Sequence, residues 1–460
     1  MSDSRVLPQI LAGFLASLSA VSVGLIYAWP TPSLPKLLAE GATLQLTSSD
    51  GAWVVSALNL GGIFGPIIAA LLVDRIGRKL SLSFTAVPIF LSWLFIYLGT
   101  NYAWLFFARF IGGIGTGAIF ALLPMYIGEV TQEKVRGALG VLITVMVTAG
   151  NLITYTVGPW VTREILALIS AVPSIIFILT FIWMPESPYY LIMKKRSTEA
   201  ANSLAWLRDT LMVKEELRRI TEQVEIEQKS KGKITEIVTV PGNRKAMMII
   251  LGLLSAQQFS GTIPLLSYAT LIFQQAAYSL HPNISVIIVG VVTLIFSLLA
   301  VLLVDKVGRK PLLLFSSAGT CFCLCLLAIF FHLQYANMNV SSISWLPLVT
   351  IILFNVPYSM GIGSLPNAVL SEIFPTNVKA WATMLASTYG SLLGMILIKL
   401  FQVISDAKDV FAAFYTLAAI EASFIFFIYF IVPETKNKSL KEIQEILHSH
   451  VTKSNAIIHT

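Results

Sequence analysis

Long apolar runs separated by short polar segments set the pattern of this chain. Ile63–Val73, Ile165–Met184 and Ile284–Val304 hold almost no charged side chains, whereas Lys194–Lys245 is rich in them. A helix that crosses a bilayer needs about 20 apolar residues. By that measure the sequence predicts twelve spans, near residues 8–29, 52–73, 81–99, 103–128, 138–158, 163–184, 246–275, 283–304, 311–333, 344–370, 380–403 and 409–432.

Composition narrows the class of protein. Of 460 residues, 56% are hydrophobic and 12% are charged, against about 25% charged in soluble proteins. The runs do not alternate with a period of two, so the prediction is an all-α integral membrane protein and not a barrel. A water-soluble enzyme, a disordered chain and a disulfide-stapled domain are excluded. Because only Arg5 precedes the first span and no cleavage site comes after it, we expect a retained first helix.

The positive residues predict the orientation. With a cytosolic N-terminus the outer loops carry only Lys36, Arg163 and Lys408 of the 31 Lys and Arg, while Arg109 and Lys399 fall inside spans. An even number of spans then places both termini in the cytosol, and we expect a multi-pass protein of the plasma membrane. The sequons at Asn283 and Asn339 fall in outer loops, where glycosylation is possible. The sequon at Asn437 falls inside.

Two other features have simple explanations. The net charge of +7 reflects cytosolic loops that face anionic lipid, so the bilayer is the expected partner and nucleic acid is not. Cys321, Cys323 and Cys325 lie two residues apart within one span. A metal or redox cluster is the alternative interpretation, but no His or acidic partner is near, so we expect apolar filling, no metal and no cofactor.

The chain repeats itself. Asp74-Arg-Ile-Gly77-Arg78-Lys79 after the second span returns as Asp305-Lys-Val-Gly308-Arg309-Lys310 after the eighth. Glu129 precedes Arg136, and Glu372 precedes Lys379, by the same spacing; Pro185-Glu186 and Pro433-Glu434 close spans 6 and 12. Three motifs in register indicate an internal duplication. The predicted organisation is a six-helix half (1–184), a cytosolic linker with short helices (185–245), a second six-helix half (246–432) and a cytosolic tail (433–460). Amphipathic patterns predict the linker helices near Ser197–Leu207 and Lys214–Val224, and a floppy linker is the alternative.

With these motifs in view, the chain resembles the sugar porter family of the major facilitator superfamily over almost its full length. Further matches are Arg109-Phe-Ile-Gly-Gly-Ile-Gly115, Gln257-Gln258-Phe-Ser-Gly261 and Ser371-Glu-Ile-Phe-Pro375. The outer loops are similar in style to those of insect trehalose and sugar transporters. The resemblance implies two pseudo-symmetric halves that alternate access to a sugar site near the middle of the membrane.

The charged motifs are candidates for a cytosolic gate. Arginine–carboxylate forks could hold the two halves together there, and the resemblance implies that they close the inner side in the outward-open state. The alternative is a set of solvated topology signals worth about 0–1 kcal/mol each. The candidate residues are Asp74, Arg78, Glu129, Arg136, Glu186, Asp305, Arg309, Glu372, Lys379 and Glu434.

A second set of residues is expected to meet the substrate. Amides suit sugar hydroxyls because they both donate and accept hydrogen bonds, and Gln257 and Gln258 match the family's sugar-contacting glutamines. The alternative is a pair that bonds neighbouring helices. Other family positions are altered, with Ile263 and Gly390-Ser391 replacing polar or aromatic residues, which puts glucose selectivity in doubt. The remaining candidates for substrate contact are Thr144, Thr293, Asn355 and Asn367.

Two intramembrane charges remain to be explained. Arg109 should face a partner or the bundle interior, as a support near the translocation path. The first span, Gln9–Trp29, has no acid, although proton-coupled relatives carry one there, so facilitated diffusion is expected. Glu421 in the last span is either a coupling site or a buried structural partner. The alternatives to a sugar uniporter are a proton-coupled carrier, a carrier for a polyol or other non-sugar, and a non-transporting nutrient sensor. No enzyme site or channel filter is readable.

Overall fold

A computed structural model of the chain describes residues 6–42, 44–210, 212–229, 233–276, 280–436 and 442, with the side chains of 133–134, 227, 229, 300–307, 371 and 376 outside that description. Twelve helical segments within these ranges are long and apolar enough to cross a membrane, which confirms the predicted count. All regular elements of the described part are helical, so the predicted class is also confirmed.

The chain divides into two compact units, Met1–Lys229 and Ser230–Thr460, within the predicted linker. The helices of the first unit are α1 (Leu7–Ala28), α2 (Pro30–Leu38), α3 (Ser48–Ile76), α4 (Arg78–Phe84), α5 (Ala86–Leu98), α6 (Tyr102–Val130), α7 (Glu133–Val157), α8 (Arg163–Phe181), α9 (Pro188–Met193), α10 (Ser197–Arg208) and α11 (Lys214–Lys229). Those of the second are α12 (Glu236–Thr239), α13 (Pro241–Phe259), α14 (Thr262–Ser267), α15 (Ala269–Gln275), α16 (Pro282–Val307), α17 (Arg309–Tyr335), α18 (Leu346–Met360), α19 (Leu365–Ile373), α20 (Thr376–Lys408) and α21 (Val410–Ile431). Short 3-10 turns lie at Gly158–Trp160 and Ser341–Ile343.

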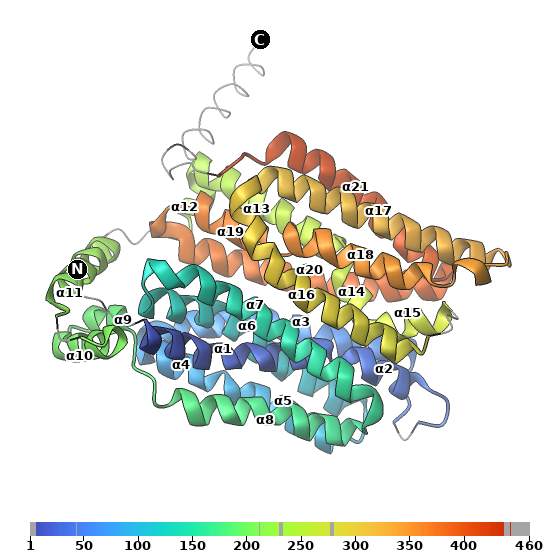
Figure 1. Cartoon of the computed structure of the whole chain (residues 1–460), viewed down its shortest axis with the longest axis horizontal. Helices are drawn as coiled ribbons and strands as arrows, with labels where there is room; N and C mark the ends of the chain where they lie inside the picture. Colours follow the sequence, from blue (N-terminus) through green and yellow to red (C-terminus); the bar gives the residue numbers. More distant parts are fainter. Residues whose placement is uncertain are drawn as a thin grey trace, which may run out of the picture. The chain divides into compact units, whose positions relative to one another are not determined.

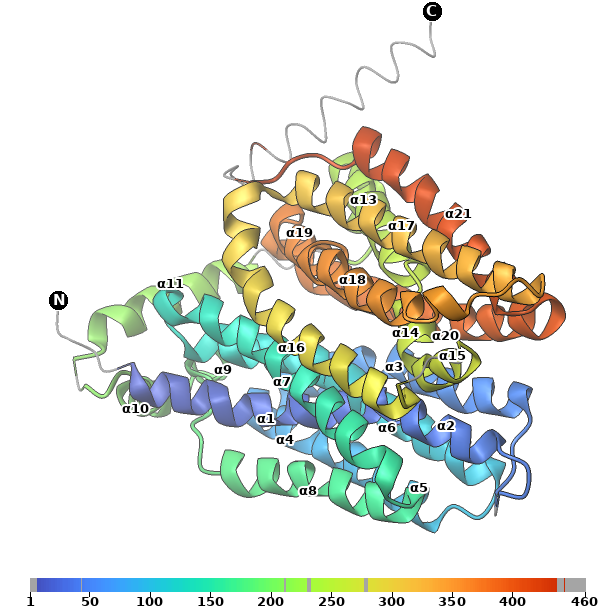
Figure 2. The same ribbon diagram turned by 45° about the vertical axis from the view of Figure 1, so that its right-hand side comes forward.

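The helix pairings repeat from one unit to the other. In the first unit α3 packs along α6, α1 along α7 and α5 along α8. In the second unit the helices at the same places in the repeat pack in the same way: α16 on α18, α13 on α20 and α17 on α21 (Figures 1 and 2). The duplication indicated by three short motifs is therefore also a duplication of packing.

Glycine allows the closest of these contacts. A Cβ at Gly61 of α3 would lie 1.9 Å from the carbonyl oxygen of Phe110, and a Cβ at Gly113 of α6 would lie 2.0 Å from that of Leu58. No larger residue fits at either position without moving the helices apart. Small residues at membrane helix interfaces allow this close approach of the two backbones.

Two spans of the second unit are interrupted. The seventh breaks after α13, where Gly261 has φ +82°, and continues as α14 and α15. The tenth breaks between α18 and α19, at residues 361–364. Both breaks leave backbone polar groups outside a helical ladder, which is tolerated at membrane depth where protein or a cavity meets them. Continuous apolar runs gave no sign of these breaks.

Short helices come after the sixth span. The predicted helices near 197–207 and 214–224 are present as α10 and α11, while α9 and α12 were not predicted. Arg208 at the end of α10 is buried, donates to the Val130 carbonyl (3.0 Å) and pairs with Glu216 (2.7 Å). These contacts tie the segment to α6 and argue against a floppy linker up to that point. The predicted tail lies outside the described residues from 437 onward, except for residue 442.

Candidate functional site: two ion-pair networks and an interrupted amide site

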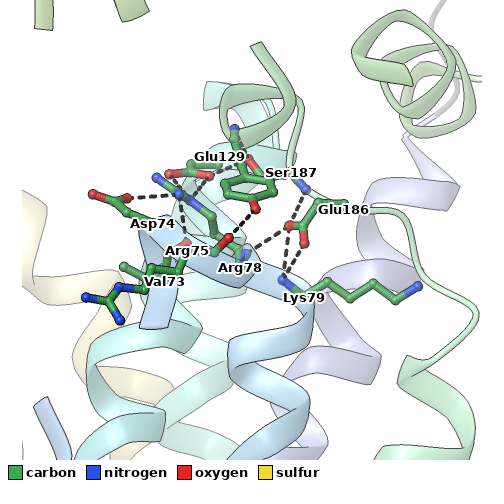
Figure 3. A network of polar contacts seen from close by, with 9 residues as sticks. Val73, Asp74, Arg75, Arg78, Lys79, Glu129, Glu186 and Ser187 are labelled. Atoms are coloured by element: carbon green, nitrogen blue, oxygen red, sulfur yellow. Dashed lines mark hydrogen bonds and ion pairs between the residues drawn. The ribbon is translucent and has the colours of Figure 1, made fainter. Parts of the chain in front are cut away.

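The first network lies where α3 ends and α4 begins. Gly77 takes φ +98°, which turns the chain so that the next two N–H groups point at Glu186. The backbone N–H groups of Arg78 and Lys79 each donate to its Oε1 at 3.0 Å, and that of Ser187 donates at 2.8 Å (Figure 3). A carboxylate at a helix N-terminus is favoured because unpaired N–H groups and the helix dipole meet there.

Arg78 joins this turn to α6. Its Nε donates to both carboxylate oxygens of Glu129, at 2.9 and 3.1 Å, and its Nη1 reaches Asp74 at 3.2 Å (Figure 3). Ser187 donates its hydroxyl to Oε2 of the Glu129 carboxylate. The ring of Tyr190 lies 5.4 Å from the guanidinium carbon, and the tyrosine hydroxyl donates to the Arg75 carbonyl at 2.9 Å. The arginine is thus enclosed on several sides.

The second unit repeats the arrangement. Gly308 takes φ +107°, and the N–H groups of Arg309 and Lys310 donate to Glu434 at 3.1 and 3.0 Å. Arg309 pairs with Glu372 at 2.9 Å, and the hydroxyl of Thr435 donates to the same carboxylate. The arginine–glutamate pair, the two backbone bonds at the glycine turn and the hydroxyl bond are therefore repeated in the second unit.

The hydroxyls of Ser187 and Thr435 were missed in the sequence. The available signal was a hydroxyl residue directly after the glutamate in both closing motifs, Pro-Glu-Ser and Pro-Glu-Thr. The described pairs all join helices of one unit, so the prediction that such forks hold the two halves together stays a prediction. Arg136 donates to the Thr131 carbonyl at 3.1 Å, and Lys379 lies in the first turn of α20. The side chain of Asp305 lies outside the description.

The two glutamates at the glycine turns differ electrostatically. Burial raises the pKa of the Glu186 carboxyl above its ordinary value, against the opposing effect of the backbone N–H groups of Lys79, Ser187 and Arg78. Burial also acts to raise the pKa of Glu434, but there the backbone N–H groups, that of Lys436 foremost, outweigh it and the pKa is lowered. The pKa values of the glutamates at these equivalent positions are therefore shifted in opposite directions.

The predicted amide pair lies at the interrupted spans. Gln257, near the end of α13, donates its Nε2 hydrogens to the carbonyl oxygens of Ile362 and Gly363, at 3.1 and 2.9 Å. These carbonyls belong to the break in the tenth span, so one glutamine bridges the two interruptions. Gln258 is half-buried and lies beside Gly390, from which a Cβ would be 3.7 Å from its Nε2. The bond between helices weighed as the alternative for this pair is present at Gln257.

The other predicted substrate residues do not join the two interrupted spans. Asn355 is buried and donates to the Ile351 carbonyl of its own helix at 2.8 Å, and Thr293 likewise donates to Val289 at 2.7 Å. Asn367 and Thr144 have exposed side chains. Asn355 and Thr293 therefore use an amide or hydroxyl on the backbone of their own helix, whereas Gln257 reaches another span.

Arg109 is 1% exposed and lies between α6 and α1. It donates to the Ile26 carbonyl, and its guanidinium carbon lies 5.3 Å from the centre of the Trp29 ring. A buried arginine needs such partners because an unpaired charge in the membrane interior is costly. Its expected contact with a partner inside the bundle is present. No group of three His, Cys, Asp or Glu side chains in the described part is placed to hold a metal ion.

Each unit contains six membrane spans, and both units carry the same ion-pair network at a glycine turn. These features define the class, a multi-pass membrane transporter of duplicated fold. A family model described as "Sugar (and other) transporter" matches residues 10–447, and the chain belongs to that family. It is a transporter family and not one of enzymes.

Among relatives, the chain is 34% identical to the facilitated trehalose transporter Tret1 of Bombyx mori over 96% of this chain and 87% of that one. It is 32% identical to Tret1 of Apis mellifera ligustica over 99% and 91%. The proton:xylose symporter XylE bound to 6-bromo-6-deoxy-D-glucose has the same fold, with TM-score 0.77 and 23% identity over 95% of this chain and 99% of that one. A partially occluded, inward-open structure of XylE from E. coli gives 0.79 and 22% over 94% and 99%.

Proposed function

We propose that this chain is a facilitative sugar carrier, a uniporter that moves a hexose or a disaccharide such as trehalose by alternating access. The observation that carries the proposal is the amide pair Gln257-Gln258 at the point where two spans are interrupted. The amide of Gln258 offers both donors and acceptors to sugar hydroxyls there. Gln257, whose Nε2 hydrogens meet Ile362 and Gly363, offers its Oε1 as an acceptor. The relatives named as facilitated trehalose transporters supply the substrate class.

Uniport is favoured by the first span, which contains no acid between Gln9 and Trp29. A proton-coupled carrier is the second candidate, because Glu421 is an acid buried in the last span and a solved structure of the same fold is named as a proton:xylose symporter. A carrier of polyols or other non-sugars and a non-transporting sensor are further alternatives.

The experiment that tests the function is uptake of a labelled panel, namely glucose, fructose, trehalose and polyols, into proteoliposomes with and without a proton gradient. We expect saturable uptake of at least one carbohydrate that the gradient leaves unchanged. Uptake that requires the gradient would favour the proton-coupled alternative, and no saturable uptake of any carbohydrate would remove the main proposal.

The ion-pair networks are proposed as the cytosolic gate of this carrier. Each network fixes three helix ends of one half, through Arg78 and Glu129 in the first and Arg309 and Glu372 in the second. Glu186→Gln and Arg136→Ala are then expected to shift the resting state toward inward-open. Unchanged uptake and unchanged sidedness of an inhibitor in both variants would contradict the gate.

Plasma-membrane residence with both termini cytosolic is part of the proposal. The outer sequons then differ as glycosylation sites. Asn339 is exposed in a loop, whereas Asn283 is half-buried in the first turn of α16 and its Ser285 is 1% exposed. We expect Asn339→Gln to abolish a glycosidase-sensitive shift in mass and Asn283→Gln to leave it; a shift that persists in Asn339→Gln would contradict this order.

A further inference from the structure

Glu421 lies in the middle of α21 and is fully buried, with 0% exposure. Its Oε1 accepts a hydrogen bond from the Ser317 hydroxyl of α17 at 2.7 Å. Its Oε2 has no donor of ordinary geometry in the described part of the chain. A polar group is rarely buried this deeply without a task, because leaving water costs free energy that one hydrogen bond only partly returns.

The residue next to Ser317 connects α17 to the tenth span. The adjacent Ser316, also 0% exposed, accepts a hydrogen bond at 2.9 Å from the backbone N–H of Ile362. Ile362 lies in the break of the tenth span, where no helical carbonyl receives this N–H. Thr320 closes the turn between the serines by donating to the carbonyls of both, at 2.9 and 3.1 Å.

The break is also pressed against α17. A Cβ at Gly361 would lie 2.3 Å from the Cβ of Ser316 and 2.6 Å from the Leu312 carbonyl oxygen. The backbone of Gly361 therefore lies directly against the side chain of Ser316 and the carbonyl group of Leu312. On its other side the same four-residue break presents the carbonyls of Ile362 and Gly363 to Gln257.

We propose that Glu421 is a positioning residue for substrate binding: through Ser317 and Ser316 it holds the interruption of the tenth span against α17, and so fixes the carbonyl groups that orient Gln257. The link runs from α21 through α17 and the break to α13, wholly within the second unit. Glu421 itself does not touch the substrate. The inference rests on the proposed function for its sugar readout, but not for its structural one.

The structural readout is hydrogen–deuterium exchange of the purified full chain in detergent. Glu421→Leu, Ser317→Ala and Ser316→Ala should each speed exchange at residues 361–364 by about tenfold, as expected when a hydrogen bond that closes a local opening is lost. Glu421→Gln retains an acceptor for Ser317 and should keep the protection. Thr416→Ala is the matched control, because Thr416 lies on α21 and donates to the Ala412 carbonyl of its own helix.

The functional readout separates positioning from general destabilisation. A loosened Gln257 should raise the KM for the transported sugar by about 3–10-fold with a smaller change in maximal rate, whereas loss of folded protein lowers the maximal rate alone. Glu421→Gln should restore the KM. If exchange at 361–364 is unchanged in both serine variants, or if Glu421→Gln is as damaging as Glu421→Leu, the proposal is wrong.

These outcomes differ from a failure of the proposed function. A wild-type chain that carries no sugar would remove the KM readout and leave the exchange test of the link intact. Saturable sugar uptake together with unaltered exchange in the serine variants would remove the link and leave the carrier intact.

Discussion

The two ion-pair networks share one bonding pattern and differ in how deeply each is enclosed. In the first unit the side chains of Arg78 and Glu129 are 10% and 16% exposed, and in the second those of Arg309 and Glu372 are 17% and 26% exposed. A Cβ on the turn glycine would meet the glutamate carboxylate at 2.2 Å in the first network and at 3.1 Å in the second. The same motif thus gives a tighter turn in one half than in the other.

The segment that comes after the sixth span covers the first network. In the first unit the chain continues into α9, whose Tyr190 covers Arg78, and then into α10 and α11, which pack against it. In the second network the described ring contact falls on the lysine, with Lys310 Nζ 5.7 Å from the Tyr429 ring centre. The duplicated motif therefore forms the same bonds in both halves, whereas the ring contact falls on the arginine in the first network and on the lysine in the second.

Removing the arginines should show this difference most strongly. Arg78→Leu leaves Glu129 buried without its cation and should cost about 2–4 kcal/mol, near the range for breaking a buried pair. Arg309→Leu should cost about 1–2 kcal/mol, because more water screens Glu372. Thermal unfolding of the purified protein, with Arg78→Lys and Arg309→Lys as charge-retaining controls, measures both. Equal losses in the two leucine variants would mean that enclosure does not matter.

Alanine at the turn glycines should have the next largest effect. Both positions have positive φ with an extended ψ, a region almost exclusive to glycine, so alanine is strained by about 1–3 kcal/mol at either one. At residue 77 the methyl group must also displace the Glu186 carboxylate, whereas at residue 308 a shift of a few tenths of an ångström is enough. We expect Gly77→Ala to lower the unfolding temperature and the uptake rate more than Gly308→Ala does. The reverse order would contradict the tighter first turn.

Loss of the covering ring should have a smaller effect. Tyr190→Phe removes the bond to the Arg75 carbonyl and should cost about 1 kcal/mol, and Tyr190→Ala should cost somewhat more because it also removes the cation–π contact. Tyr429 is 59% exposed, so Tyr429→Ala should change the unfolding temperature little. A larger fall in unfolding temperature for Tyr429→Ala than for Tyr190→Ala would contradict the stronger covering contact in the first network.

The smallest effect expected is that the contributions of Glu186 and Glu434 to stability change with pH in opposite directions. Because the pKa of Glu186 is raised in the folded chain, its favourable contribution is present at low pH and is lost as pH rises through that value. Because the pKa of Glu434 is lowered, its contribution is present above the ordinary pKa and is lost as pH falls through the lowered value. The stability of the wild type relative to Glu186→Gln should fall with rising pH, and relative to Glu434→Gln it should rise. About 1 kcal/mol would move the midpoint by about 2–4 °C for a unit of this size, and slopes of the same sign would contradict the assignment.

Much of the fold could be predicted from the sequence, because hydropathy is a local property and a bilayer turns it directly into helices. The twelve spans were therefore found, amphipathic patterns predicted α10 and α11, and repeated motifs revealed the duplication. The breaks at Gly261 and at 361–364 were not found, since an apolar run reads the same whether or not its helix is continuous. The break at 361–364 is held by Gln257 and Ser316, which are far from it in the sequence.

The site was predicted in part for the same reason. Charged residues at helix ends are visible in the sequence, and so are paired glutamines in an apolar run. Which carboxylate meets which donor depends on the packing of distant helices, so the direct pairing of Arg78 with Glu129 and the hydroxyls of Ser187 and Thr435 required the structure. Glu421 was noticed as an acid in a span, but its link to the tenth span could not be read from spacing.

Sugar carriage through the amide site is tested by countertransport of labelled trehalose and, in parallel, glucose, into proteoliposomes preloaded with the same unlabelled sugar at equal pH on both sides. Gln257→Leu tests the amide, and Gln274→Leu, at an exposed position of α15, is the matched control. We expect transient accumulation of at least one of these sugars by the wild type and the control, strongly reduced in Gln257→Leu. No accumulation of either sugar by the wild type, or full accumulation by Gln257→Leu, would contradict the proposed carrier and its amide site.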